Sequence, residues 1–202
     1  MRGLLAIDGI IYQYMMKVYD LIVLNLIFVV ASLPLITIGA SITALYDITL
    51  NMQMHRDKTI YTAYLNSFQK NFKQATQVWI GSLLLISVAA AFASLLHGNV
   101  LVLFLILGVI VIGMMALIYT FAMIAKFKNS TANMIRNGWL LAMEYMPYSI
   151  IMLSIAGILV IAVPLYCPWA GILSIFLTFS LTAYIQSYFL TKVFTKVQGR
   201  KY

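Results

Sequence analysis

The amino-acid sequence predicts an all-α fold, a polytopic transmembrane helix bundle that forms one integral membrane domain over residues 1–202. Three observations predict it. Of the 202 residues, 63% are hydrophobic and only 9% are charged, whereas about a quarter of an ordinary soluble domain is charged. Five segments are apolar over a length that crosses a bilayer core of about 30 Å as a helix. The Lys and Arg residues lie between these segments, so the net charge of +8 indicates membrane topology and no binding of nucleic acid.

The five expected membrane spans are residues 21–40, 75–96, 100–125, 146–166 and 171–191. The third is the most apolar, and each of its Leu, Ile, Val and Phe residues favours insertion by about 0.3 to 0.6 kcal/mol. The alternative, a soluble protein with buried core helices, fails because so few charged residues would be left to form its surface. We therefore expect these helices to be surrounded by a lipid bilayer.

Basic residues set the expected orientation, because Lys and Arg in short loops remain on the cytoplasmic side. Eleven of the thirteen basic residues fall on one side of the predicted spans: Arg56, Lys58, Lys70, Lys73, Lys126, Lys128, Arg136, Lys192, Lys196, Arg200 and Lys201. The turns on the other side, 97–99 and 167–170, contain none. Five crossings then leave the N-terminus outside and the C-terminus in the cytoplasm.

The first fifty residues allow a second topology. Residues 35–50 are apolar enough for a short additional membrane segment, which would make six crossings and place the N-terminus inside. Against this, Asp47 would cost about 2.5 to 3.5 kcal/mol near the bilayer centre unless it is paired. We therefore favour a helix that leaves the membrane near Pro34 and Gly39, followed by a shallow or re-entrant segment at 41–54.

An amphipathic helix is expected over residues 59–75. Its aromatic and aliphatic residues recur every fourth position, and its lysines lie on other faces; they are Ile60, Tyr64, Phe68 and Phe72, and Lys70 and Lys73. Such a helix fits the inner membrane surface, where anionic lipids attract its basic side chains. The alternative function for the same helix is docking of a cytoplasmic partner.

Three polar residues within or next to the spans are functional candidates. Gln186 lies in the most polar span and needs a hydrogen-bond partner or water, and we favour a structural role for it over contact with a solute. Glu144 lies near the cytoplasmic end of its span, where we expect an interfacial salt bridge with Arg136, Lys126 or Lys128. Asp47 is the better functional candidate, although a lysine of the inner surface is an equally simple partner.

The sequence contains no pattern for catalysis, cofactor binding or metal binding. It has no G-x-S-x-G, H-E-x-x-H, Walker-type or G-x-G-x-x-G motif. Cys167 is the single cysteine, and His55 and His97 are the only histidines, so no ligand set has the spacing of a zinc or iron site. We therefore expect a protein that is not an enzyme and that binds no cofactor and no metal.

Two short regions resemble the YesL family of bacterial membrane proteins. The similar residues are Asn25, Leu33–Pro34, Thr37 to Ser41 and Ala44 to Tyr46, followed by Phe68 and Asn71 to Ala75, which includes Lys73. The aromatic residue usual just after the asparagine is replaced by Leu26-Ile27-Phe28. The resemblance implies a bacterial plasma-membrane protein of undefined activity, often encoded beside carbohydrate ABC transporters and sensor kinases, and it supplies no catalytic or binding residues.

The candidate motif residues are therefore Asn25, Pro34, Thr37, Gly39, Ser41, Asp47, Asn71 and Lys73. Pro34 lacks a backbone donor and Gly39 permits unusual dihedral angles, which predicts a helix break there. Asn25 is expected to be buried and to need a partner on another helix. These features favour a non-catalytic accessory or regulatory component associated with carbohydrate uptake, partnered by a sugar ABC transporter or a sensor kinase. The alternative is a small permease or channel subunit for a polar solute.

Overall fold

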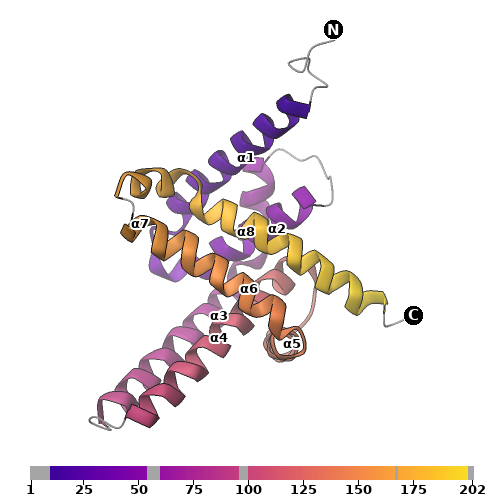
Figure 1. Ribbon diagram of the computed structural model, residues 1–202. Helices are drawn as coiled ribbons and strands as arrows, with labels where there is room; N and C mark the ends of the chain where they lie inside the picture. Colours follow the sequence, from indigo (N-terminus) through magenta and orange to yellow (C-terminus); the bar gives the residue numbers. More distant parts are fainter. Residues whose placement is uncertain (1–9, 54–59, 96–99, 167, 200–202) are drawn as a thin grey trace.

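The computed structural model of the chain describes residues 10–53, 60–95, 100–166 and 168–199, with the side chains at 10–11, 95 and 168–175 outside the description. Throughout these ranges the regular elements are helices and no strand occurs, which confirms the all-α fold. The elements are α1 (Ile10–Ala31), η1 (Leu35–Thr37), α2 (Ile38–Gln53), α3 (Ile60–Leu95), α4 (Val100–Lys126), α5 (Thr131–Glu144), α6 (Met146–Ala156), the π-helical η2 (Gly157–Ala162), α7 (Val163–Tyr166) and α8 (Pro168–Gly199) (Figure 1).

Five helical stretches among the described residues are long and apolar enough to cross a membrane: Tyr12–Ala31, Leu35–Gln53, Ile60–Ser94, Val100–Lys126 and Met146–Tyr166. This supports a multi-pass membrane protein whose apolar helices contact lipid. The expected span 171–191 lies within α8, whose first side chains are outside the description. Several residues used for the sequence predictions also lie outside it: His55, Arg56, Lys58, 97–99, Cys167, Arg200 and Lys201.

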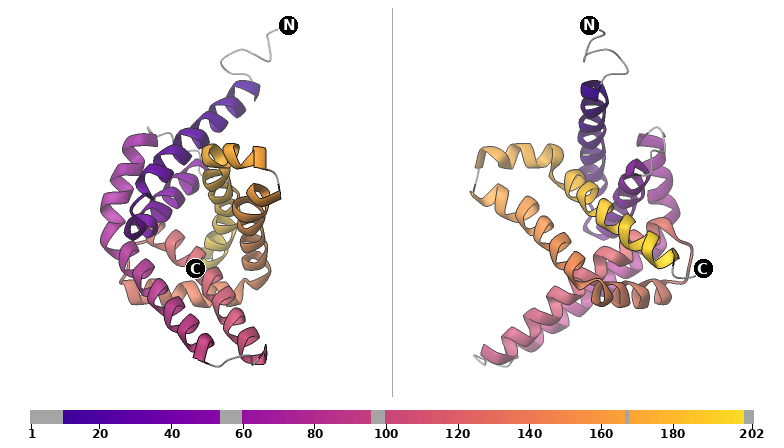
Figure 2. Two further views of the ribbon diagram at one scale, coloured as in Figure 1. Left: turned by 90° about the vertical axis from the view of Figure 1, so that its left-hand side faces the viewer. Right: turned by 45° about the vertical axis from the view of Figure 1, so that its right-hand side comes forward.

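The helices form two hairpins that diverge from a central core. Figures 1 and 2 show α3 running beside α4, and α6 with α7 running beside α8, with the tips of the two hairpins pointing in different directions. Helix α2 lies at the centre, where it contacts α1, α3, α4 and α8. The C-terminal end of α8 lies on the side of the molecule opposite the hairpin tips (Figure 1).

The expected first span, 21–40, is not one helix. Helix α1 ends at Ala31, and the chain turns through Pro34 before α2 begins. The Thr37 hydroxyl donates to the carbonyls of Ala31 and Pro34, both at 2.7 Å, and so satisfies acceptors left free at the helix end. The Trp79 indole N–H donates to the Leu35 carbonyl at 2.9 Å and ties the turn to α3.

The placement of 41–54 as a shallow or re-entrant segment stays a prediction, and the structure gives the conformation of residues 41–53. Residues 38–53 form the regular helix α2, and with η1 they make one of the five membrane-length stretches. Gly39 is the second residue of α2, directly after the break that was predicted near Pro34 and Gly39, and the structure gives that glycine a packing role as well. A Cβ at Gly39 would lie 2.6 Å from both the Ala75 carbonyl oxygen and the Trp79 Cβ. Glycine is therefore required because α2 and α3 cross here at very short distance.

The amphipathic helix expected at 59–75 is not a separate element, because α3 continues through it as a single helix of 36 residues. Its apolar face packs against α2. Tyr64, the centre of that face, is fully buried, and its hydroxyl donates to the Ser41 carbonyl at 3.3 Å. Lys70 and Lys73 remain exposed on the outer face.

Helix α5 is the amphipathic helix that lies across the ends of α4 and α6 (Figure 2). Ser130 caps it by accepting from the Asn133 backbone N–H at 3.4 Å. Gly138 allows close contact with α4, because a Cβ there would overlap the Thr120 hydroxyl. The opposite face exposes Ile135, Trp139, Leu140 and Met143. An exposed apolar face with a tryptophan fits the bilayer interface.

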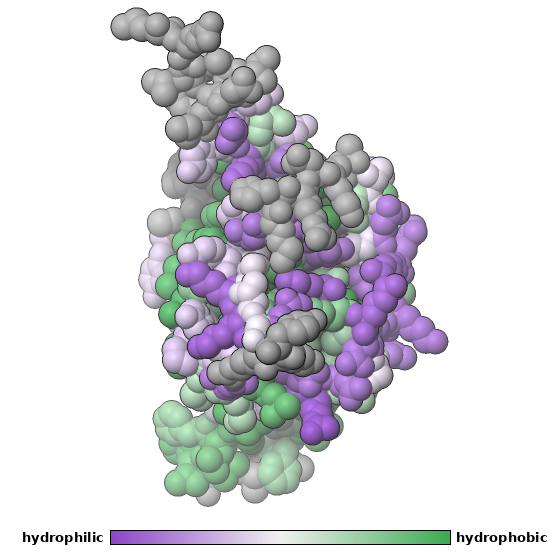
Figure 3. Space-filling view, turned by 90° about the vertical axis from the view of Figure 1, so that its right-hand side faces the viewer, coloured by the Kyte–Doolittle hydropathy of each residue, from purple (hydrophilic) through white to green (hydrophobic). Residues whose placement is uncertain are grey.

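Hydrophilic residues gather on one face of the molecule. Figure 3 looks onto the face that carries the C-terminal end of α8, where hydrophilic residues dominate, while the lower end formed by the α3–α4 hairpin is hydrophobic. This separation matches a bundle with one polar surface and two apolar hairpins that extend away from it.

Candidate functional site

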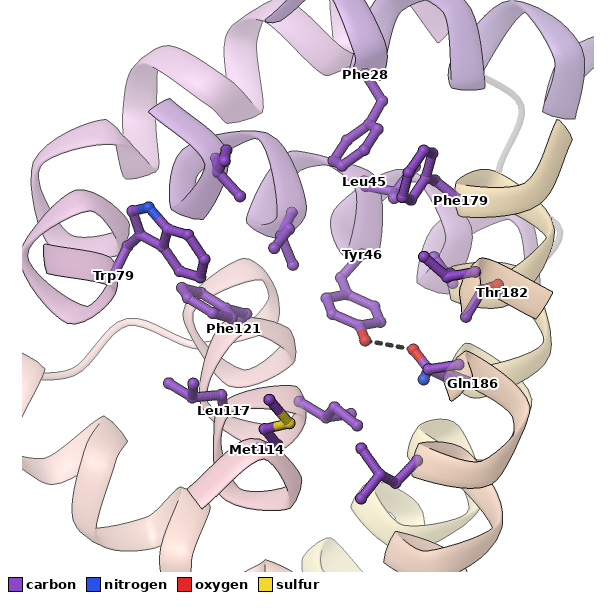
Figure 4. Close-up of a pocket in the computed structure, with 17 residues that line it drawn as sticks. Phe28, Leu45, Tyr46, Trp79, Met114, Leu117, Phe121, Phe179, Thr182 and Gln186 are labelled. Carbon is purple, nitrogen blue, oxygen red and sulfur yellow. Dashed lines mark hydrogen bonds between the residues drawn. The ribbon is translucent and has the colours of Figure 1, made fainter. Parts of the chain in front are cut away.

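A cavity of about 330 Å³ lies between the helices of the core (Figure 4). Six elements contribute to its wall: α1, α2, α3, α4, the α6–η2 segment and α8. The lining residues are Phe28, Ile38, Ile42, Leu45, Tyr46, Trp79, Met114, Leu117, Ile118, Phe121, Leu153, Ala156, Val160, Phe179, Thr182, Ala183 and Gln186. The cavity is therefore apolar apart from a few side chains.

The polar atoms in the cavity wall already have partners within the protein. The Trp79 indole N–H donates to the turn before α2, and the Thr182 hydroxyl donates to the Thr178 carbonyl at 2.7 Å. The Tyr46 hydroxyl donates to Gln186 Oε1 at 2.5 Å, and Gln186 Nε2 donates to the Met152 carbonyl at 2.9 Å (Figure 4). The wall therefore offers little to a polar ligand, and the described residues that line it include neither a carboxylate nor a cation.

The bond between Tyr46 and Gln186 belongs to a polar contact between α2 and α8. Next to it, the hydroxyls of Thr49 and Ser187 lie 2.7 Å apart, and both residues are buried. Gln53 Nε2 donates to the Tyr184 carbonyl at 3.2 Å. Buried hydrogen bonds of this kind hold membrane helices together, since lipid competes for apolar contacts.

Asn25 connects α1 to α8. It is fully buried, and its Oδ1 accepts from the Ser180 backbone N–H at 2.8 Å. A side chain that inserts into the hydrogen-bond ladder of a helix is a known cause of bends, and α8 is bent in Figure 2. The structure thus supplies the interhelical partner that the sequence predicted for Asn25.

The opposite wall contains an irregular helix. Residues Gly157–Ala162 form the π-helical segment η2, which follows Leu153 and Ala156 and includes Val160. A Cβ at Gly157 would meet no atom within 4 Å, so this glycine serves no close helix contact. π-helical segments inside α-helices occur often at functional sites, and this one borders the cavity.

The remaining sequence candidates lie outside the cavity wall. Asp47 is half-buried on α2, where its Oδ1 accepts from Asn51 Nδ2 one turn later at 3.0 Å. Asn71 is buried and donates to the Ser67 hydroxyl at 3.3 Å. Glu144 is exposed at the end of α5. Of the sequence candidates, the structure therefore places Gln186 in the cavity wall and pairs Asn25 with α8 outside the wall, and neither acidic candidate lines the cavity.

Lysines beyond the cavity, on the polar face, lie over aromatic rings. Lys126 Nζ is 5.2 Å from the centre of the Phe194 ring, and Lys196 Nζ is 5.6 Å from the centre of the Tyr145 ring. Lys192 lies 4.3 Å from the centre of the Tyr188 ring, and a hydrogen bond with Tyr188 raises the pKa of this exposed lysine. These cation–π contacts fix ammonium groups without neutralising them.

The sequence predictions missed Tyr46 and Thr49, the α2 partners of α8. A signal was present, because Tyr46, Thr49 and Gln53 recur at three- and four-residue spacing and therefore share one face of α2. The predictions also missed α5. Ser130 followed by Trp139, Leu140 and Met143 is the pattern of a capped amphipathic helix.

One protein-family model matches part of the chain. A family described as a protein of unknown function, DUF624, matches residues 21–92. That range covers much of α1, η1, α2 and most of α3, which are the elements that surround Gly39. No curated protein and no solved structure matches the chain significantly. Within the described part of the chain, no group of three or more His, Cys, Asp or Glu side chains is placed to hold a metal ion.

Proposed function

We propose that this chain is a non-catalytic accessory or regulatory protein of a bacterial plasma membrane, associated with carbohydrate uptake and acting through contacts with a partner. The link to carbohydrate uptake comes from the resemblance to the YesL family. The observation that carries the proposal is that the polar side chains of the cavity wall are hydrogen-bonded within the protein, as the Tyr46 hydroxyl is to Gln186 and the Gln186 amide is to the Met152 carbonyl. Such an interior supports a scaffold rather than a reaction or a polar pathway.

We place the polar face of Figure 3, with the C-terminus, in the cytoplasm. The support is the distribution of charge, because eleven of thirteen basic residues fall on one side of the predicted spans. The membrane-length stretch Leu35–Gln53 favours the six-crossing topology, in which the N-terminus is also cytoplasmic.

The first turns of α3 are the proposed docking surface for the partner. Because the face around Tyr64 is covered by α2, the residues that point outward are polar or aromatic. They are Tyr61, Thr62, Asn66, Gln69, Lys70 and Lys73. An exposed basic helix of this kind suits an acidic cytoplasmic surface of a sugar transporter subunit or a sensor kinase.

The alternative, a permease or channel subunit for a polar solute, has weaker support. A polar solute that leaves water needs hydrogen-bond partners along its path. The central cavity is apolar, and the amide of Gln186 is engaged on both atoms. Solute flux through vesicles that contain only this protein, reduced by Gln186→Leu, would favour the permease over the accessory role.

The proposal is tested by cross-linking and affinity purification from native membranes. We expect wild-type protein to capture a subunit of a sugar transporter or a sensor kinase, identified by mass spectrometry. Lys70→Glu with Lys73→Glu is expected to reduce that capture about tenfold, because two favourable charge contacts become repulsive. The matched control is Lys192→Glu with Lys196→Glu, which changes the net charge equally on the same side but on α8.

Two results would contradict the proposal. One is a wild-type protein that captures neither class of partner under conditions where both are present in the membrane. The other is equal loss of capture in the α3 and α8 double variants, which would indicate a general charge effect rather than a docking surface.

A further inference from the structure

The central cavity is lined by residues of several helical stretches that are long and apolar enough to cross a membrane. Its α4 residues, Met114 to Phe121, and its α8 residues, Phe179 to Gln186, lie before the basic ends of both helices. Beyond the cavity, the hairpins diverge (Figures 1 and 2) and expose large apolar side chains such as Leu85 and Phe104, which are 74% and 69% exposed. An occupant that enters from the bilayer would therefore reach the cavity from the side away from the polar face.

The chemistry of the wall selects an apolar occupant. The labelled side chains that point into the space in Figure 4 include Phe28, Leu117 and Met114. The hydroxyl of Tyr46 and the amide of Gln186 bond to each other across one side. A polar molecule in this space would lose its hydration without gaining partners, which is strongly unfavourable.

The cavity offers about 330 Å³ to an apolar occupant. An α-helix with its side chains is about 10 to 12 Å across. An extended hydrocarbon chain is much thinner, so it fills such a space with less displacement of the wall. An empty cavity would cost its lining side chains their dispersion contacts.

We propose that this cavity holds one acyl chain of a bilayer phospholipid, which enters between the diverging hairpins. Lipid tails are as apolar as the wall, so burial from water supplies no driving force between the bilayer and the site. The chain is held by close contacts with the aromatic and aliphatic wall, and it completes the packing of six helical elements. It is therefore a structural lipid that links the two hairpins.

The first test measures the phospholipid that remains bound after purification of the full chain in mild detergent, by native mass spectrometry. We expect wild-type protein to retain one phospholipid. Ala156→Phe places a larger side chain at a half-buried position of the wall and is expected to reduce retention about tenfold. Ala90→Phe, at an exposed position of α3 outside the wall, is expected to retain the lipid as wild type does.

A second measurement does not depend on survival of the lipid through purification. Trp79 lines the cavity, and Trp139→Phe with Trp169→Phe leaves it as the only tryptophan. In vesicles of phospholipid with brominated acyl chains, we expect quenching of Trp79 fluorescence that Ala156→Phe reduces and Ala90→Phe does not. Equal quenching in both variants would overturn the proposal. Retention of a polyprenyl lipid in place of a phospholipid, detected by mass spectrometry, would also overturn it. The same holds for a cross-link from the cavity to a helix of a partner protein.

Discussion

The central core and the α3–α4 hairpin beyond Trp79 are built by different rules. In the stretch that contains α2, 56% of the residues of its most apolar window are buried, whereas the corresponding figure for α4 is 11%. The core contains hydrogen bonds between helices, such as those of Asn25 and Tyr46. The outer hairpin has hydroxyls, such as those of Ser87 and Ser94, that bond only to carbonyls of their own helix.

This difference follows from the solvent. Lipid tails are as apolar as Leu or Phe, so apolar side chains give no net drive for helices to associate in a bilayer. The core must therefore be specified by small residues that permit close approach and by buried polar pairs. The outer hairpin needs only enough apolar residues to remain in lipid. Substitutions should consequently have large effects in the core and small effects in the hairpin.

The largest effect is expected at the crossing of α2 and α3. Gly39→Val would place a branched side chain where even a Cβ lies 2.6 Å from the Ala75 carbonyl oxygen. Because that neighbour is backbone, the helices must separate, and we expect the free energy of unfolding to fall by about 3 kcal/mol. Reversible unfolding in mixed detergent and SDS micelles, followed by circular dichroism, measures this change.

The matched control is Gly81→Val on α3. A Cβ at Gly81 would meet no atom within 4 Å, so the same substitution causes no steric overlap there. Its unfolding free energy is expected to change by less than about 1 kcal/mol, because only helix propensity is altered. If both variants lose the same stability, the close crossing is not what requires Gly39.

A smaller effect is expected for the bond between α2 and α8. Gln186→Leu removes the acceptor of the Tyr46 hydroxyl and leaves the Met152 carbonyl without its donor. We expect a loss of about 1 to 2 kcal/mol in unfolding free energy. A double-mutant cycle with Tyr46→Phe should give a coupling energy of about 0.6 to 1.7 kcal/mol.

Gln198→Leu provides the control for this cycle, because Gln198 is an exposed glutamine on the same helix. It is expected to leave stability unchanged within about 0.5 kcal/mol. A coupling energy near zero between positions 46 and 186 would show that the two helices are held together by other contacts.

Hydropathy was sufficient to predict the fold class and three of the membrane helices, since 75–96, 100–125 and 146–166 each correspond to a helical stretch of membrane length. It was not sufficient for α2. The cost of a buried carboxylate argued against a membrane helix through Asp47, but Asn51 lies one turn away and donates to it. The hydrogen bond from Asn51 lowers the cost of burying the Asp47 carboxylate. A prediction that only counts charged residues in a segment does not include such a bond.

The cavity depends on contacts that have no sequence signature. Gln186 was identified as a residue in need of a partner, but the identity of that partner depends on how α2 crosses α8. The helix break predicted near Pro34 and Gly39 is present, because α1 ends at Ala31 and α2 begins at Ile38. The close helix crossing at Gly39 was not predicted, because it depends on where α3 places Ala75 and Trp79.

The smallest effect is expected in the outer hairpin. Its size relative to the same kind of substitution in the core makes the comparison of the two regions quantitative. Phe104 is 69% exposed on α4, whereas Leu24 on α1 is fully buried. Phe104→Ala removes contacts that lipid replaces, so the unfolding free energy should change by less than about 0.5 kcal/mol. Leu24→Ala leaves a cavity that the core does not refill and should cost about 2 to 5 kcal/mol. Both variants are measured in the same micelles. If Phe104→Ala lowers the unfolding free energy nearly as much as Leu24→Ala does, the contacts of the ring are not replaced by lipid. The outer hairpin would then be packed against a further protein surface.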